Sequence, residues 1–154
     1  MLTIGRISQN DILCDWLGFP YDVLMTNEKP ASANVTQQHD WRVLIVEDEY
    51  FLADDLARGF GKEGISIVGP VPSVDRAMAL VAQKQINLAV LDIALDGDKV
   101  YDVADALLAQ DVPVLFVTGY DRDAIPDRYA SVPICQKPVG VDDVIKALRR
   151  IISE

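Results

Sequence analysis

The sequence is poor in cysteine. Its 154 residues contain only two, Cys14 and Cys135. Two cysteines are too few for a disulfide framework, and neither lies in a cluster with the spacing of metal ligands. We therefore interpret both as ordinary thiols in a reducing compartment and expect the protein to be cytoplasmic.

Long apolar runs are also missing. No stretch approaches the roughly 18 consecutive apolar residues that a transmembrane helix needs. The N-terminus lacks the basic region and the uninterrupted apolar core of a secretory signal. We expect no association with a membrane.

Basic charge is scarce relative to acidic charge. Lysine and arginine total 14 against 24 aspartates and glutamates, which gives a formal net charge of -10. A protein that holds DNA or RNA irrespective of sequence needs a basic face that displaces counterions. We therefore expect no nucleic acid partner.

What the chain does contain is enough apolar material for one domain. Hydrophobic residues make up 50% of the sequence, which suits an α/β domain with a sizeable core. Residues 1–40 differ from the rest: a short helix is predicted near residues 9–17, and the polar residues 26–40 are typical of a linker. We predict an N-terminal extension over residues 1–40 and a domain over residues 41–154. Whether the extension is loosely ordered or docks on the domain or a partner stays open.

Five apolar runs alternate with segments of helical periodicity. Strands are predicted at residues 43–46, 65–68, 87–91, 113–117 and 132–136. Helices are predicted from the apolar spacing of Leu52, Leu56 and Phe60, of Ala77, Leu80 and Val81 behind a cap at Ser73, of Val100, Val103, Ala104, Leu107 and Leu108, and of Val144, Ile145, Leu148 and Ile152. This alternation predicts a doubly wound α/β fold, with a five-stranded parallel sheet in the order 2-1-3-4-5.

The segment between the fourth and fifth strands does not fit a regular helix. Residues 121–129 contain Pro126, which lacks a backbone N–H and disfavours helical geometry at Ile125. We predict a short or broken helix here.

Acidic side chains follow two of the predicted strands. Glu47 and Asp48 end the first strand, and Asp92 ends the third. In the predicted order these strands are neighbours, so the three carboxylates converge on one crevice. Carboxylates that repel each other favour a shared cation, and oxygen ligands without nearby histidine or cysteine indicate Mg²⁺. The alternative is that each acid is a solvated loop residue.

Two further polar groups follow the other strands. Thr118 ends the fourth strand, and Lys137 follows the fifth, where Pro138 could fix the backbone direction through a cis bond. A carboxylate can attack a phosphoryl group while a metal and an ammonium neutralise its oxygens. Asp92, alone at a strand end, is the candidate nucleophile. A turn role for Thr118 and a solvated Lys137 are the alternatives.

This set of residues, in this order and spacing, resembles the receiver domain of two-component response regulators, over about residue 41 to the end. The resemblance implies that Asp92 accepts a phosphoryl group from a sensor histidine kinase in phosphorelay signal transduction. It further implies that Glu47 and Asp48 hold Mg²⁺ directly or through water, with the backbone carbonyl of Ala94. Thr118 and Lys137 would sense the phosphoryl group.

One subgroup of receivers resembles the chain more closely. The run Phe116-Val117-Thr118-Gly119-Tyr120 is similar to the motif of the FAT GUY receivers, with Val117 in place of alanine. Receivers usually carry an aromatic residue three positions before the lysine, where this chain has Ile134. Together with the broken fourth helix, this departure implies a different output surface.

Several functions were weighed on these residues. Because the chain ends with the fifth helix, we expect a stand-alone receiver that is a phosphoacceptor and not an enzyme with an external substrate. A phosphate sink, a relay to a downstream phosphotransfer or target protein, and a binding module independent of phosphorylation stay open. A phosphatase of the haloacid dehalogenase type needs a second acid where Ala94 stands, and a flavodoxin needs a phosphate-binding loop where the chain has Glu47, Asp48 and Glu49.

Overall fold

Five parallel strands form the sheet that organises the computed structural model. The strands are β1 (Arg42–Val46), β2 (Ser66–Val71), β3 (Leu88–Leu91), β6 (Val114–Thr118) and β7 (Ile134–Gln136). They lie in the order β2-β1-β3-β6-β7, and every neighbouring pair is parallel. Counted along the chain, this is the predicted order 2-1-3-4-5. The doubly wound α/β fold is confirmed.

The structure describes residues 40–153. The helix predicted near residues 9–17, Cys14 and all but the last residue of the predicted linker lie outside the described residues. The extension over residues 1–40 therefore stays a prediction.

Burial on both faces of the sheet explains why the interior positions of the central strands are apolar. Val43 and Ile45 of β1 belong to one buried cluster, and Leu44 and Val46 belong to the other. Successive side chains of a strand point to opposite faces of the sheet, so a strand covered on both faces has no position left for a polar residue. All four of these side chains are fully buried.

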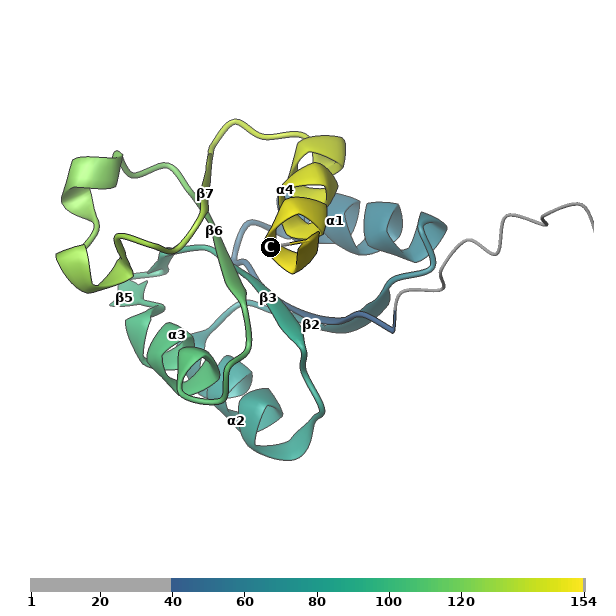
Figure 1. Cartoon of the computed structure of the whole chain (residues 1–154), viewed down its shortest axis with the longest axis horizontal. Coiled ribbons are helices and arrows are strands. Elements are labelled where there is room, and N and C mark those ends of the chain that lie inside the picture. The colour runs from purple at the N-terminus through teal and green to yellow at the C-terminus, as the bar shows by residue number, and fades with distance from the viewer. Residues whose placement is uncertain (1–39, 154) are drawn as a thin grey trace, which may run out of the picture. The chain divides into compact units, whose positions relative to one another are not determined.

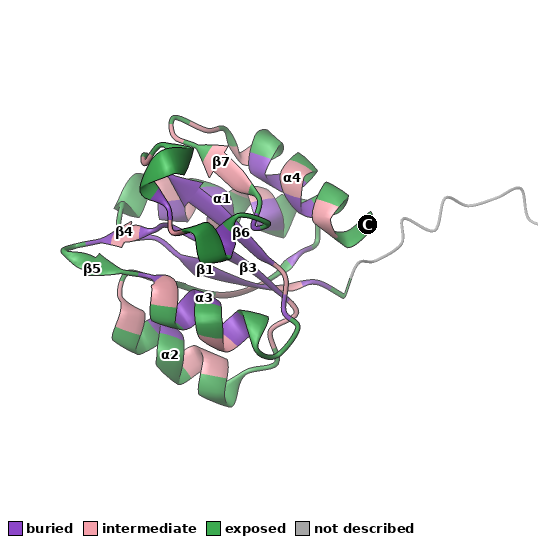
Figure 2. Cartoon of the chain, turned by 60° about the vertical axis from the view of Figure 1, so that its left-hand side comes forward, coloured by how far each residue is buried: buried purple, intermediate pink, exposed green. Residues whose placement is uncertain are grey.

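Helices cover both faces of the sheet. On one face α1 (Tyr50–Lys62) and α4 (Val141–Ser153) lie together, and on the other face α2 (Val74–Gln83) and α3 (Tyr101–Leu108) do (Figures 1 and 2). Each presents an apolar face to the sheet, with the other face exposed. Over residues 40–153, the structure contains no helix with both the length and the apolar character required to cross a bilayer.

The predicted end of the second strand is wrong, and the predicted cap of the second helix is confirmed in position only. β2 does not end at Gly69 and Pro70 but continues through them to Val71, with a cis bond between the two. Ser73 does stand at the N-cap of α2, but its side chain makes no capping hydrogen bond. Ser73 therefore occupies the predicted N-cap position but does not make the side-chain hydrogen bond for which serine is favoured there.

The segment after β6 is irregular, as predicted. Two 3-10 turns, η2 (Arg122–Ala124) and η3 (Asp127–Tyr129), stand on either side of Pro126 in place of a helix. The guanidinium of Arg122 donates to the carbonyl oxygens of Val132, Tyr129 and Ala130, which satisfies backbone groups that a helix would have paired internally.

A short hairpin between β3 and α3 was not predicted. β4 (Ala94–Leu95) and β5 (Asp98–Lys99) pair antiparallel around a turn at Asp96 and Gly97, which both have positive φ. The hairpin follows the carboxyl end of β3, and Figure 2 shows its two short strands, β4 and β5, at that end of the sheet.

Candidate functional site

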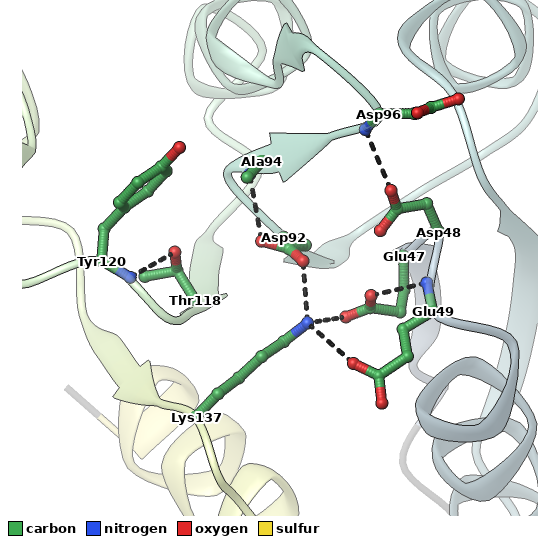
Figure 3. A network of polar contacts seen from close by, with 9 residues as sticks. All are labelled: Glu47, Asp48, Glu49, Asp92, Ala94, Asp96, Thr118, Tyr120 and Lys137. Carbon is green, nitrogen blue, oxygen red and sulfur yellow. Dashed lines mark hydrogen bonds and ion pairs between the residues drawn. The ribbon is translucent and has the colours of Figure 1, made fainter.

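The carboxyl ends of four neighbouring strands bring the predicted site residues to one edge of the sheet. Glu47 directly follows β1, and Asp92 directly follows β3. Thr118 is the last residue of β6, and Lys137 comes directly after β7. In a parallel sheet all these ends point the same way, so residues far apart in sequence meet in one crevice (Figure 3).

Lys137 contacts three carboxylates of the site. Its ammonium nitrogen lies 2.8 Å from Asp92 Oδ2, 2.9 Å from Glu47 Oε2 and 3.8 Å from Glu49 Oε2 (Figure 3). The peptide bond from Lys137 to Pro138 is cis, as the sequence allowed. The lysine is therefore not a solvated loop residue but the cation at the centre of three carboxylates.

The two carboxylates closest to this ammonium are buried. Glu47 is 4% exposed and Asp92 is 6% exposed. Burial raises the pKa of Glu47 above its ordinary value, because it penalises the charged form, and the hydrogen bond from Lys137 only partly offsets this. Burial by itself would lower the pKa of Lys137, but hydrogen bonds to Asp92 and Glu47 outweigh it and raise that pKa.

Backbone N–H groups hold the remaining carboxylate oxygens. Ala94 N–H donates to Asp92 Oδ1 at 3.0 Å, and Glu49 N–H donates to Glu47 Oε1 at 2.9 Å. The turn of the hairpin reaches Asp48 in the same way, since Asp96 N–H donates to Asp48 Oδ2 at 2.9 Å. Each acid is thus held in a fixed orientation by the loop that follows its own or a neighbouring strand.

The three acids are arranged as a group that could hold a cation. One carboxylate oxygen from each of Glu47, Asp48 and Asp92 lies within 4.8 Å of the others. Of these three acids, Glu47 and Asp92 pair with the single ammonium of Lys137, so the negative charge of the group is only partly balanced. Hard oxygen donors in this number suit Mg²⁺, which keeps several waters and takes few protein ligands. The residues present therefore fit a divalent cation.

Thr118 lies in the same crevice with a different set of contacts. Its side chain is fully buried, and its hydroxyl oxygen accepts a hydrogen bond from Tyr120 N–H at 3.1 Å (Figure 3). Its carbonyl oxygen accepts from Lys137 N–H at 2.8 Å, which fixes β6 to the lysine. The turn role weighed for Thr118 is thus real, and it leaves the hydroxyl proton free to donate.

Ile134 stands where receivers usually carry an aromatic residue, and it packs against a cluster with aromatic side chains from other segments. Ile134 is half-buried on β7, against the cluster that contains Phe116 and Tyr129. Tyr129, from the broken segment, stacks on Tyr101 and meets Phe116 edge to face. Its hydroxyl donates to Asp105 at 2.6 Å. Burial, followed by the hydrogen bond to Asp105, raises the pKa of Tyr129 to about 12.

Sequence reasoning missed the residues of the hairpin that reach the site. Asp96 holds Asp48 through its N–H, and the Lys99 ammonium contacts both the hydroxyl and the ring of Tyr120. The Asp96-Gly97 pair is a known hairpin signal and was available in the sequence. The remaining cysteine, Cys135, is a free and half-buried thiol whose pKa is raised by burial.

Comparison with known proteins agrees with this geometry. The model of the response regulator receiver domain matches residues 43–149. The solution structure of SdrG from Sphingomonas melonis Fr1 is 38% identical, covers 73% of this chain and 96% of SdrG, and superposes with a TM-score of 0.65. The receiver domain from Methanospirillum hungatei, at 22% identity and a TM-score of 0.65, covers 73% of this chain and 94% of that one and supports the fold.

Full-length regulators are also similar. The sensory transduction protein RegX3 of Mycolicibacterium smegmatis is 35% identical over 118 residues, which cover 71% of this chain and 50% of RegX3. The chain thus spans about half the length, or less, of the curated relatives that it matches. The family model matches more than half of the chain, and the strand order of the chain is the one that the sequence predicted. The chain therefore belongs to the family of response regulator receiver domains.

Proposed function

We propose that this receiver takes a phosphoryl group onto Asp92 from a sensor histidine kinase, in the presence of Mg²⁺, and signals through the change of shape that follows. The single observation that carries the proposal is the contact of Lys137 with both Asp92 and Glu47, at 2.8 and 2.9 Å, beside a third carboxylate. A cytoplasmic location belongs to the same proposal.

In the chemical step an oxygen of the Asp92 carboxylate attacks the phosphorus of a phosphohistidine. A new O–P bond forms while the P–N bond breaks, and its electron pair returns to the imidazole, which takes a proton from water. The N–H of Ala94 and the ammonium of Lys137 hold the carboxylate in place before the attack. Lys137 has three donors, so it can follow the phosphoryl oxygens and keep a contact to Glu47.

Glu47, Asp48, Asp92 and the carbonyl of Ala94 would hold the metal. When bound, Mg²⁺ supplies positive charge that neutralises the phosphoryl oxygens as the transfer proceeds. Asp48 is the most exposed of the three acids, and Glu47 and Asp92 are buried beneath it. The site is therefore open on the side from which a hydrated ion and a donor arrive.

The hydroxyl of Thr118 and the ammonium of Lys137 respond to the new group. The hydroxyl proton is free while its oxygen accepts from Tyr120 N–H, so Thr118 donates to a phosphoryl oxygen. The receiver acts as a phosphoacceptor that promotes its own phosphotransfer. The phosphorylation state of Asp92 then favours one of two arrangements of the segment that follows β6.

We further propose that the chain belongs to the FAT GUY subgroup. The support is the run from Phe116 to Tyr120, Ile134 on β7, and the pair of 3-10 turns where only a short or broken helix was expected. Tyr129 fills the core beside Phe116 from that broken segment. Output then passes through the aromatic residues around β6 and not through an aromatic on β7.

The experiment is phosphorylation by a small phosphodonor, followed by the mass of the intact protein. Wild type gains one phosphoryl group with Mg²⁺ and none after chelation, and Asp92→Asn gains none under either condition. An equal gain by Asp92→Asn, or no gain by wild type, contradicts the proposal. A phosphoester that is turned over many times would instead establish an enzyme on the same fold.

A further inference from the structure

One side of the crevice is closed by a contact between the hairpin and the loop after β6. The Lys99 ammonium donates to the phenol oxygen of Tyr120 and lies 3.9 Å from the centre of its ring. An ammonium over an aromatic face is attracted by the ring in addition to the hydrogen bond. We call these two residues the clasp. Lys137 approaches Asp92 from β7, through a separate set of contacts.

The clasp is connected to the reactive carboxylate through the hairpin. Lys99 on β5 is the direct cross-strand partner of Ala94 on β4. Ala94 N–H is the group that donates to Asp92 Oδ1. The hairpin also reaches Asp48 through Asp96 N–H. The hairpin that carries Lys99 therefore also supplies the backbone N–H groups that hold two of the acids.

The clasp is connected to Thr118 at its other end. Tyr120 N–H donates to the Thr118 hydroxyl oxygen at 3.1 Å (Figure 3). Between the two stands Gly119, where a side chain would meet nothing within 4 Å, so packing of that residue does not restrain the loop. The position of the Tyr120 N–H group thus depends on the Tyr120 side chain, and Lys99 holds the hydroxyl end of that side chain.

These contacts form a continuous series that runs from Asp92 through Ala94, Lys99 and Tyr120 to Thr118. A threonine hydroxyl has one proton to donate, and its oxygen can accept two hydrogen bonds. When Tyr120 N–H occupies the oxygen, the proton is left for a phosphoryl oxygen. We infer that Lys99 is a positioning residue for phosphoryl binding: by holding Tyr120 it keeps the Thr118 hydroxyl oriented as a donor toward the group on Asp92. The inference rests on the proposed function and adds a residue to it.

The test is the affinity for beryllofluoride, a tetrahedral anion of phosphoryl size, at saturating Mg²⁺, followed through backbone amide NMR signals of the full chain. Lys99→Met keeps most of the aliphatic stem and removes the ammonium. We expect it to weaken beryllofluoride binding about fivefold to tenfold, the size of one ordinary hydrogen bond. Tyr120→Leu, which removes both the hydroxyl and the ring, weakens it by a similar factor. The double variant binds beryllofluoride as tightly as the single variant with the lower affinity, because both residues act as one unit.

Two controls separate positioning from charge and from folding. Lys99→Arg keeps a cation that can both hydrogen-bond and stack, and it binds beryllofluoride within about twofold of wild type. Lys62→Met removes an exposed ammonium at the far end of α1 and changes nothing. Mg²⁺ affinity without beryllofluoride stays within about twofold in all clasp variants, since the acids themselves are untouched.

The outcomes are distinct. If Lys99→Met binds beryllofluoride within twofold of wild type while Asp92→Asn does not bind it, the proposed function holds and the clasp inference is wrong. If Tyr120→Leu has no effect and Lys99→Met does, Lys99 acts by charge alone, which also overturns the inference. If wild type does not bind beryllofluoride, the proposed function fails and the inference fails with it.

Discussion

At the scale of single residues, the buried acids of the crevice depend on one ammonium. Removing one partner of a buried ion pair leaves an uncompensated charge, which costs more than the pair contributed. Lys137→Met leaves Asp92 and Glu47 without their cation. We expect the free energy of unfolding without Mg²⁺ to fall by about 2 to 3 kcal/mol. Urea unfolding measures it, and added Mg²⁺ should restore part of the loss.

A matched control for this variant lies on α4. Lys146 pairs with Asp143 at 3.3 Å, but both side chains are about two thirds exposed. Exposed pairs of this kind contribute little, so Lys146→Met should stay within about 0.5 kcal/mol of wild type. Equal losses in the two lysine variants would contradict the account of the site.

Tyr129 gives the molecule a dependence on alkaline pH. Its pKa is raised from 10.0 to about 12, so the folded state binds the phenolic proton more tightly than the unfolded chain does. The stabilisation is therefore present below pH 10 and is lost as the pH rises toward 12. Relative to Tyr129→Phe, wild type should lose about 1.3 kcal/mol of unfolding free energy between pH 9 and pH 11. Parallel pH curves for the two proteins would show that the phenol is not linked to folding.

At the scale of elements, the contact of α1 with α4 is limited by the size of one residue. A Cβ atom on Gly59 would lie 2.2 Å from Val141 Cγ1, so an alanine forces the two helices apart. Gly59→Ala should lower the unfolding free energy by about 1 to 3 kcal/mol. The double variant Gly59→Ala/Val141→Ala should recover most of it, because the colliding methyl group is gone.

The same helix contains its own control. A Cβ atom on Gly61 would meet nothing within 4 Å. Gly61→Ala should therefore stabilise the protein by up to about 1 kcal/mol, through helix propensity alone. Chemical denaturation of the three variants decides the matter, and destabilisation by both single substitutions would show that close packing at Gly59 is not the cause.

The start of α1 exposes an aromatic pair beside the crevice. Tyr50 is 74% exposed and Phe51 is 77% exposed, with their rings edge to face at 5.7 Å. Phe51 also lines a hollow with Lys137 and Pro138. Exposed aromatic groups of this kind are typical of protein contacts.

Phe51→Ala should therefore slow phosphoryl transfer from a phosphorylated kinase about tenfold. Transfer from a small donor should stay within about twofold, because the small donor needs no docking surface. The two rates are measured from the mass of the intact protein over time. Ile152→Ala, on the exposed end of α4, is the control. A similar loss with both donors would place the effect of Phe51 in the site and not in docking.

The elements that a sequence predicts well are those defined by their own periodicity. β1, β3 and β6 were found because their interior residues are apolar and buried on both faces of the sheet. The strand order then placed Glu47, Asp48 and Asp92 together without any knowledge of distance. The hairpin of β4 and β5 was missed because two-residue strands carry no periodicity, although the Asp96-Gly97 turn was visible.

Contacts between side chains of different loops were beyond the sequence. Nothing in the spacing of Lys99 and Tyr120 indicates that they meet, because the hairpin and the β6 loop are brought together only by the completed sheet. The same holds for Tyr129, whose ring enters the core between Tyr101 and Phe116 from a segment without helical pattern. Such pairs depend on tertiary structure, which local propensity does not encode.

At the scale of the whole molecule, one sheet edge concentrates the charge that the function uses. The chain has a formal net charge of -10, and three of its carboxylates meet at a single edge beside one half-buried ammonium. The apolar sheet beneath cannot solvate them, so the site is ordered by ion pairs, by backbone N–H groups and by any cation that it binds. The fold thus holds these charges in fixed positions before any ligand arrives.

The most direct test of the central claim is the position of the phosphoryl group in the phosphorylated protein. Borohydride reduces an aspartyl phosphate to homoserine, and peptide sequencing by mass spectrometry then identifies the residue. We predict homoserine at position 92 alone, in samples phosphorylated with Mg²⁺, and none in samples treated with a chelator. Homoserine at another acid of the crevice, or phosphate recovered on a hydroxyl or histidine side chain, would contradict the account.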